Sequence, residues 1–227
     1  MKRVACSSAP LTKSPTKPLI TAIYLAAGLS RRMGKPKLDL PFHGAPLGAH
    51  ALRTLLDMDE IQHIFLIVRP DDPLDWLLPA THHPNFRVKT TLTPSPKAHL
   101  GQSHSLRSGI LAAQTINADA ALILLADQPF VSRDLLHELL QRYRHDYNQA
   151  ISPHYVASCH KDILRPPILL TSNLFPNILE LEGDEGARRL LKKGSWQGSL
   201  VDWKVERDFY DIDTEEAYLD LLQREFE

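Results

Sequence analysis

Cysteine and long apolar runs are both scarce in this sequence. The 227 residues contain two cysteines, Cys6 and Cys159, which lie far apart in the chain. We therefore expect no structural disulfide and a reducing, cytoplasmic setting. No apolar run approaches the length needed to cross a membrane, and the basic start of the chain has no apolar signal-peptide core behind it. These absences argue against secreted, disulfide-stabilised and membrane-spanning classes of protein.

An excess of charge of either sign is also missing. The chain carries 26 Lys and Arg against 27 Asp and Glu, a formal net charge of −1. Such a chain has no general attraction for nucleic acid or anionic membranes, and we expect neither as a partner. The eleven histidines show no recognised zinc spacing, so we interpret them as surface or packing residues. Any anion site must therefore be local.

The composition past the first residues is that of an ordinary globular domain. Ser, Pro, Thr and Lys dominate residues 1–18, which predicts a disordered leader; a partner-binding arm is the alternative. Hydrophobic residues make up 43% of the chain, enough for a sizeable core. We expect one domain over 19–227.

Short β-branched apolar runs alternate with segments of helical periodicity. Strands are predicted over 19–27, 61–69, 86–92 and 120–126, and another begins within 150–155. Helices are predicted over 47–58, 105–116 and 132–147, the last with Ser132 as N-cap, and a helix start lies within 71–80. This alternation predicts an α/β fold with a mainly parallel sheet covered on both faces. In such sheets the site lies beyond the carboxyl ends of the strands.

The first loop at this edge reads LAAGLSRRMGKPK and follows the first predicted strand. Its small residues would let a phosphate group approach the backbone N–H groups, and its basic residues would offset phosphate charge. The small residues are Ala26, Ala27 and Gly28, and the basic ones include Arg32, Lys35 and Lys37. The loop is neither a Walker loop nor a dinucleotide-binding glycine motif. A solvated basic turn is the structural alternative.

A second loop, LGQSHSLRSG, precedes the helix predicted over 105–116. Gly101 frees the backbone, Ser103 and Ser105 supply hydroxyl groups, and Arg107 supplies a positive charge. The alternative is that one of the two serines only caps the helix.

Three aspartates form the third candidate feature. Asp127 ends the most apolar predicted strand, where an unpaired charge is costly, and Mg²⁺ would be a suitable partner. The segment 209–222 is predicted to contain a short strand, then two acidic residues, Asp211 and Asp213, and then a helix. The two aspartates stand one residue apart, so on a strand they would share a face. Either could complete a metal site with Asp127. The alternatives are that Asp127 caps its turn and that Asp213 or Thr214 caps the following helix.

Together these loops resemble a known enzyme family. LAAGLSRRMGKPK resembles the signature L-A-A-G-x-S-x-R-M-G-x-x-K of the MobA-like nucleotidyltransferases. GQSHSLRSG resembles their second loop, and LADQP resembles their metal-binding aspartate loop. GDEGARRLL (183–191) and DIDT (211–214) resemble later motifs of the molybdenum cofactor cytidylyltransferases and their purine-catabolism relatives. The resemblance spans about residues 20–222.

That resemblance implies a Rossmann-like, three-layer α/β/α nucleotidyltransferase fold and an Mg²⁺-dependent reaction. CMP would pass from CTP to molybdopterin carrying molybdenum, with release of pyrophosphate. Ala27, where guanylyl-transferring relatives usually carry Gly, favours CTP. A molybdenum hydroxylase would receive the product. The implied site residues are Arg32 and Lys37 on the triphosphate; Asp127 with Asp211 or Asp213 on Mg²⁺; and Leu25, Ala26, Ala27, Gly28, Gly101, Ser103 and Ser105 around the nucleotide.

Two other functions stay open at this point. One is a cytidylyltransferase that acts on a sugar phosphate or methylerythritol phosphate. The other is a non-catalytic accessory protein that carries the molybdenum cofactor to a hydroxylase such as xanthine dehydrogenase. The segment RPPILL (165–170) matches the acceptor-contacting segment of the resembled branch only loosely.

Overall fold

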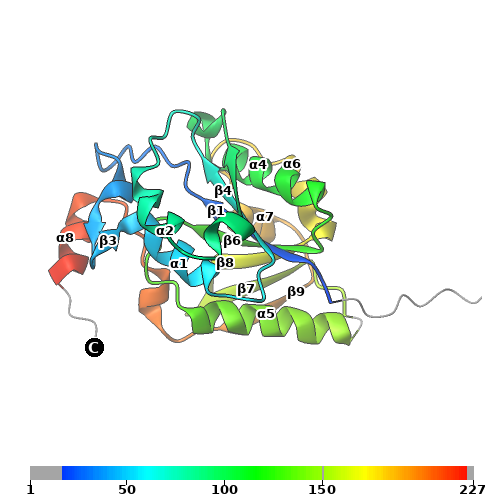
Figure 1. The fold of residues 1–227 in the computed structure, drawn as a ribbon. Coiled ribbons are helices and arrows are strands. Elements are labelled where there is room, and N and C mark those ends of the chain that lie inside the picture. The colour runs from blue at the N-terminus through cyan, green and yellow to red at the C-terminus, as the bar shows by residue number, and fades with distance from the viewer. Residues whose placement is uncertain (1–16, 150, 224–227) are drawn as a thin grey trace, which may run out of the picture.

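A seven-stranded sheet runs through the part of the chain that the computed structural model describes, residues 17–149 and 151–223 (Figure 1). Its strand order is β5-β4-β1-β6-β8-β7-β9. Only β8 runs against its neighbours, because β6 and β7 pair with it antiparallel and every other pairing in this sheet is parallel. The seven strands are β1 (Ile20–Leu25), β4 (His63–Val68), β5 (Thr90–Pro94), β6 (Ala120–Leu125), β7 (Tyr155–His160), β8 (Ile163–Thr171) and β9 (Gly198–Asp202).

Helices and a small hairpin complete the described structure. The α-helices are α1 (His50–Leu56), α2 (Leu78–Thr81), α3 (Phe86–Lys89), α4 (Gln102–Thr115), α5 (Arg133–Asn148), α6 (Phe175–Leu179), α7 (Ala187–Lys193) and α8 (Glu215–Gln223). Short 3-10 helices span Lys37–Asp39, Leu47–Ala49, Asp75–Leu77, Ala98–Leu100, Ser172–Leu174 and Glu206–Phe209. The hairpin pairs β2 (Pro41–Phe42) with β3 (Ala45–Pro46). No helix within the described ranges is both long and apolar enough to span a bilayer.

The sheet is the middle of three layers, as the alternation of apolar segments predicted. On β6, Leu122 and Leu124 face a cluster that contains α1 and α5, whereas Ala121 and Ile123 face the cluster that contains α4, α6 and α7. Side chains alternate between faces along a strand, so a run buried on both faces must be apolar throughout. Figure 1 shows α4 and α6 on one side of the sheet and α5 on the other. The expected Rossmann-like α/β fold is confirmed.

Helix α4 packs closely on the centre of the sheet. A Cβ added at Gly109 would come within 2.4 Å of Cγ2 of Ile23 on β1. This close approach fixes where the amino end of α4 stands relative to the loop that follows β1.

Three local predictions differ from the structure. The segment predicted as a strand over 86–92 forms helix α3 first, and strand β5 begins at Thr90. Apolar and polar residues do alternate in this segment, as in a strand. One helical turn nevertheless lets Phe86 pack on the core while Val88 stays exposed. Thr90 Oγ1 then donates to the Phe86 carbonyl at 2.6 Å and ends the turn.

The helix predicted over 105–116 begins earlier, at Gln102, because Gly101 takes a φ of +129° and ends the preceding turn. Ser103 and Ser105 therefore lie inside α4 and do not cap it. Ser132 caps α5 as predicted, accepting from the N–H of Leu135 at 3.2 Å.

No strand forms at the start of segment 209–222, where a short one was predicted. A 3-10 helix ends at Phe209 and α8 begins at Glu215, with the hydroxyl of Thr214 accepting from the N–H of Ala217 at 3.2 Å. The next predicted strand, within 150–155, begins only at Tyr155. Residues 1–16 of the predicted leader and residue 150 lie outside the described residues.

Candidate functional site

The first loop leaves β1 at the carboxyl edge of the sheet and turns sharply. The N–H of Ala26 donates to the Ile67 carbonyl at 2.8 Å, which continues the sheet by one residue. The carbonyl of Ser30 then accepts from the N–H groups of Met33 and Gly34 at 3.0 and 3.1 Å. Ser30 and Gly34 have φ values of 50° and 66°. The turn therefore begins and ends with a residue in the left-handed backbone conformation. The turn brings the basic residues back toward the sheet edge.

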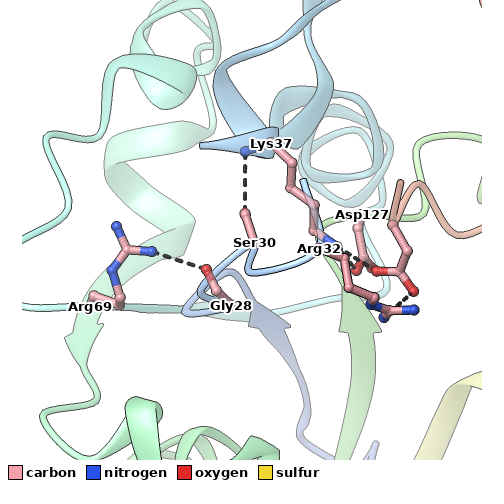
Figure 2. A network of polar contacts seen from close by, with 7 residues as sticks. Gly28, Ser30, Arg32, Lys37, Arg69 and Asp127 are labelled. Carbon is pink, nitrogen blue, oxygen red and sulfur yellow. Dashed lines mark hydrogen bonds and ion pairs between the residues drawn. The ribbon is translucent and has the colours of Figure 1, made fainter. Parts of the chain in front are cut away.

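Lys37 is directed between two carboxylates by this turn. Its N–H donates to Oγ of Ser30 at 3.2 Å, and its side-chain ammonium lies 2.6 Å from Oδ2 of Asp127 and 2.9 Å from Oδ1 of Asp213. The guanidinium of Arg32 contacts the other oxygen of Asp213 at 2.7 Å (Figure 2). Four side chains from three separate segments of the chain thus form one charge network.

The pKa values of these groups follow from their neighbours. Burial lowers the pKa of the Lys37 ammonium, but the charges and hydrogen bonds of Asp127 and Asp213 outweigh it and leave the pKa raised. Burial raises the pKa of Asp213, but Lys37 and Arg32 together hold it below its usual range. The Lys37 ammonium and the Asp213 carboxylate are therefore both charged near neutral pH.

Asp211 lies outside this network. Asp211 is exposed as a whole residue, but local desolvation of its carboxyl, followed by the negative charge of Asp127, raises its pKa to about 6. Ile212 between the two aspartates is fully buried, and its N–H donates to the Asp127 carbonyl at 3.0 Å. The shared face expected of Asp211 and Asp213 is wrong, because without a strand the two side chains line different cavities.

The oxygens of Asp127 and Asp213 are a suitable donor set for a hard divalent cation. Both carboxylates already converge on one positive charge, the Lys37 ammonium. The second oxygen of Asp127, Oδ1, is buried and has no hydrogen-bond partner. Mg²⁺ binds through one or two carboxylates and takes its remaining ligands from phosphate and water. Among the described residues, no group of three or more His, Cys, Asp or Glu side chains is placed to hold a metal ion.

The second loop is held by a glycine-to-glycine contact. A Cβ added at Gly101 would lie 2.2 Å from the carbonyl carbon and oxygen of Gly183. That same carbonyl accepts from the N–H of Ser103 at 3.1 Å. The GDEGARRLL segment is therefore packed on the amino end of α4, and its Asp184 reaches the site.

These loops enclose one cavity of about 390 Å³. Residues that the sequence singled out line it from all three loops: Leu25, Ala27, Gly28, Arg32, Lys37, Gly101, Ser105, Asp127 and Asp213. Ala26 and Ser103 do not line it, because the Ala26 N–H is taken by the sheet and the Ser103 side chain is fully buried in α4. Gly28, Ser105 and Asp127, remote in sequence, thus share one cleft.

A second cavity of about 210 Å³ adjoins the first and shares Leu25, Gln102 and Leu125 with it. Its walls are mostly apolar, from α4, β6 and β8, and its charged lining residues are Arg188 and Asp211. Because the cavities share these residues, a molecule bound in one cavity would lie next to a molecule bound in the other.

Sequence reasoning missed several residues that shape the cleft. Arg31, at a position that the family pattern leaves free, donates to the His99 carbonyl at 3.1 Å and joins the first loop to the turn before α4. Arg69 donates to the Gly28 carbonyl at 3.0 Å (Figure 2). Arg69 directly follows the carboxyl end of β4, which is where sites lie in such sheets. Its position in the sequence could therefore have indicated a role at the site.

Comparison with known proteins identifies the family. Residues 22–199 match the model of the MobA-like NTP transferase domain. The chain belongs to this family. The MobA-like domain is 38% identical to the purine catabolism protein PucB of Bacillus subtilis over 91% of this chain and 97% of that one. It is 30% identical to the nicotine blue oxidoreductase of Paenarthrobacter nicotinovorans over 90% of this chain and 97% of that one.

A solved structure shows the same fold as this MobA-like domain. It is the complex of Rv0371c from Mycobacterium tuberculosis with manganese, with a TM-score of 0.64 and 22% identity. The match covers 91% of this chain and all of that one.

Proposed function

We propose that this MobA-like nucleotidyltransferase transfers CMP from CTP to a molybdopterin-type acceptor in the cytoplasm and releases pyrophosphate. The observation that carries the proposal is the convergence of Lys37, Asp127 and the Gly28 loop on one cleft. A triphosphate needs an open backbone, positive charge and a divalent cation, and this cleft offers groups suited to each.

The reaction needs no protein nucleophile. The acceptor phosphate attacks the α-phosphorus of CTP in line, the new P–O bond forms, and the bond to pyrophosphate breaks. Lys37 and Arg32 supply positive charge to the triphosphate, which is held against the open backbone at Gly28. Catalysis therefore consists of positioning and charge stabilisation.

Asp127 and Asp213 would hold the divalent cation, most simply Mg²⁺. When bound, the cation neutralises phosphate charge and helps to orient the reacting groups. The buried, unpartnered Oδ1 of Asp127 supports this assignment. So does the manganese in the solved Rv0371c complex of the same fold.

We assign the acceptor to the second cavity. Its apolar walls would suit a flat heterocycle, and Arg188 would pair with an anionic group. Because the two cavities share a wall, the acceptor phosphate would lie beside the α-phosphate of the nucleotide. The name of PucB, a purine catabolism protein, supports a link to molybdenum hydroxylases, which would receive the product.

A panel of nucleoside triphosphates tests this function. Pyrophosphate release is measured for CTP, GTP, ATP and UTP with Mg²⁺ and molybdopterin, molybdenum-loaded molybdopterin or methylerythritol phosphate. We expect release only with CTP and a molybdopterin acceptor. Release with methylerythritol phosphate alone would move the protein to the sugar-phosphate class. Tight binding of the cofactor without any release would make it a carrier.

A further inference from the structure

Arg69 reaches the nucleotide loop from outside the cleft. Its guanidinium donates to the Gly28 carbonyl at 3.0 Å, yet Arg69 is absent from the residues that line the cavity. In Figure 2 it stands on one side of the loop, and Lys37 and Asp127 stand on the other. Arg69 therefore contacts the loop that binds the ligand without facing the ligand itself.

The hydrogen bond sets the orientation of one peptide plane. The Gly28–Leu29 peptide is trans, so its carbonyl and its N–H point in opposite directions. With the carbonyl held toward Arg69, the N–H of Leu29 points away from Arg69 and toward the cleft side of the loop. Glycine itself does not hold this orientation, since a residue without Cβ rotates easily.

Arg69 is in turn anchored by an aspartate that is itself fixed. Its guanidinium lies 3.8 Å from Oδ2 of Asp72, whose side chain is only 6% exposed. Oδ1 of Asp72 accepts from the N–H of Leu74 at 2.9 Å, which locks the carboxylate. Nε of Arg69 also donates a hydrogen bond to Oδ1 of Asp71 at 3.3 Å, but the Asp71 side chain is 82% exposed and has no further partner among the described residues to fix it.

We propose that Arg69 is a positioning residue: anchored by Asp72, it holds the Gly28–Leu29 peptide so that the Leu29 N–H faces the triphosphate. This inference rests on the proposed function, because it requires that the cleft bind a nucleoside triphosphate. The charge-assisted bond to the carbonyl is strong enough to select one peptide orientation from two.

Nucleotide affinity of matched variants tests the proposal. Isothermal titration calorimetry measures the Kd of CTP with Mg²⁺ and no acceptor for the wild type, Arg69→Met, Asp72→Asn and Asp71→Asn. We expect the Kd to rise about 10-fold in Arg69→Met, as for loss of one charge-assisted hydrogen bond. We expect kcat at saturating CTP and the Tm to stay near wild type, and Arg69→Lys to restore part of the affinity.

The two aspartate variants separate positioning from simple electrostatics. Each removes one negative charge near the cleft, which by charge alone would strengthen binding of an anion. If Arg69 acts by positioning the loop, Asp72→Asn should instead bind CTP several-fold more weakly than the wild type. Asp71→Asn should show no loss of CTP affinity. Unchanged affinity in Arg69→Met, or tighter binding in Asp72→Asn, overturns the proposal. A fall in Tm that accounts for the lost affinity also overturns it.

The two proposals fail in different ways. A wild type that binds none of the four nucleoside triphosphates overturns both the proposed function and the role of Arg69. A wild type that binds CTP as tightly as Arg69→Met does leaves the function standing and removes only the positioning role.

Discussion

The ammonium of Lys37 lies 2.6 Å from the carboxylate of Asp127, with side-chain exposures of 10% and 21%. In this largely buried pair each charge has a partner of the opposite sign. The same contact places a cation where the donor set for a divalent metal converges. Under the proposed function, the bound metal and triphosphate would redirect Lys37 from Asp127 toward phosphate oxygens.

Removing the carboxylate charge of Asp127 should abolish transfer without unfolding the protein. In Asp127→Asn we expect pyrophosphate release to fall at least about 100-fold, because the cation loses its principal ligand. Lys37 keeps Asp213 as a partner, so we expect the free energy of unfolding to drop by only about 1–3 kcal/mol. Turnover assays and urea denaturation measure the two effects. Glu215→Gln, which breaks only the exposed Lys35–Glu215 pair, serves as the control and should change neither.

Removing the ammonium of Lys37 should strengthen the binding of a divalent metal and weaken the use of CTP. In Lys37→Met, Asp127 and Asp213 lose the cation between them, so we expect Mn²⁺ alone to bind more tightly than in the wild type. The KM for CTP should rise because a positive charge on the triphosphate is gone. Calorimetric titration with Mn²⁺ in the absence of nucleotide measures the first effect. Weaker Mn²⁺ binding in the variant would show that Lys37 does not occupy the metal position.

Gly28 and Gly101 should respond differently to alanine. A Cβ at Gly28 would meet no atom within 4 Å, and its φ is not in the left-handed region. Gly28→Ala should therefore keep or raise stability, by about 0.4–1 kcal/mol, because the unfolded chain loses freedom. The added methyl group would enter the cleft, so the KM for CTP should rise. Equal CTP use by variant and wild type would show that the ligand does not approach this backbone.

Gly101→Ala should instead destabilise the protein. The added Cβ would collide with Gly183 at 2.2 Å, and the φ of +129° is strained for alanine. We expect a loss of about 1–3 kcal/mol in the free energy of unfolding, with separation of the GDEG loop from α4. Thermal unfolding measures the loss. A variant as stable as wild type would mean that the two loops are not held by this contact.

The stability of the protein should fall in mild acid through His50. Its Nε2–H donates to the Phe42 carbonyl at 2.7 Å, and burial, the main cause, lowers its pKa below the ordinary value of 6.5. Between the lowered pKa and 6.5 the unfolded chain binds more protons, so the free energy of unfolding decreases as the pH falls below 6.5. Urea denaturation at pH 7.5 and 5.5 should show a smaller decrease in His50→Gln than in wild type. An equal decrease would assign the pH dependence to other groups.

The sequence by itself determined the layers and the edge of the sheet that carries the site. Runs such as the one in β6 are apolar at every position, and only a strand buried on both faces needs this pattern. Parallel strands end at one edge, so the loops that contain Gly28, Ser105 and Asp127 had to converge there. The family motifs fall in these same loops.

Only the tertiary structure decided which side chains meet. The Lys37–Asp127 contact joins residues 90 apart, and the Arg69–Gly28 contact joins residues 41 apart. The local sequence pattern carries no information on which remote residues come into contact, because these contacts depend on how the helices and loops pack against the sheet. A shift of three residues in the start of α4 buried Ser103, and the absence of one short strand directed Asp211 and Asp213 into different cavities.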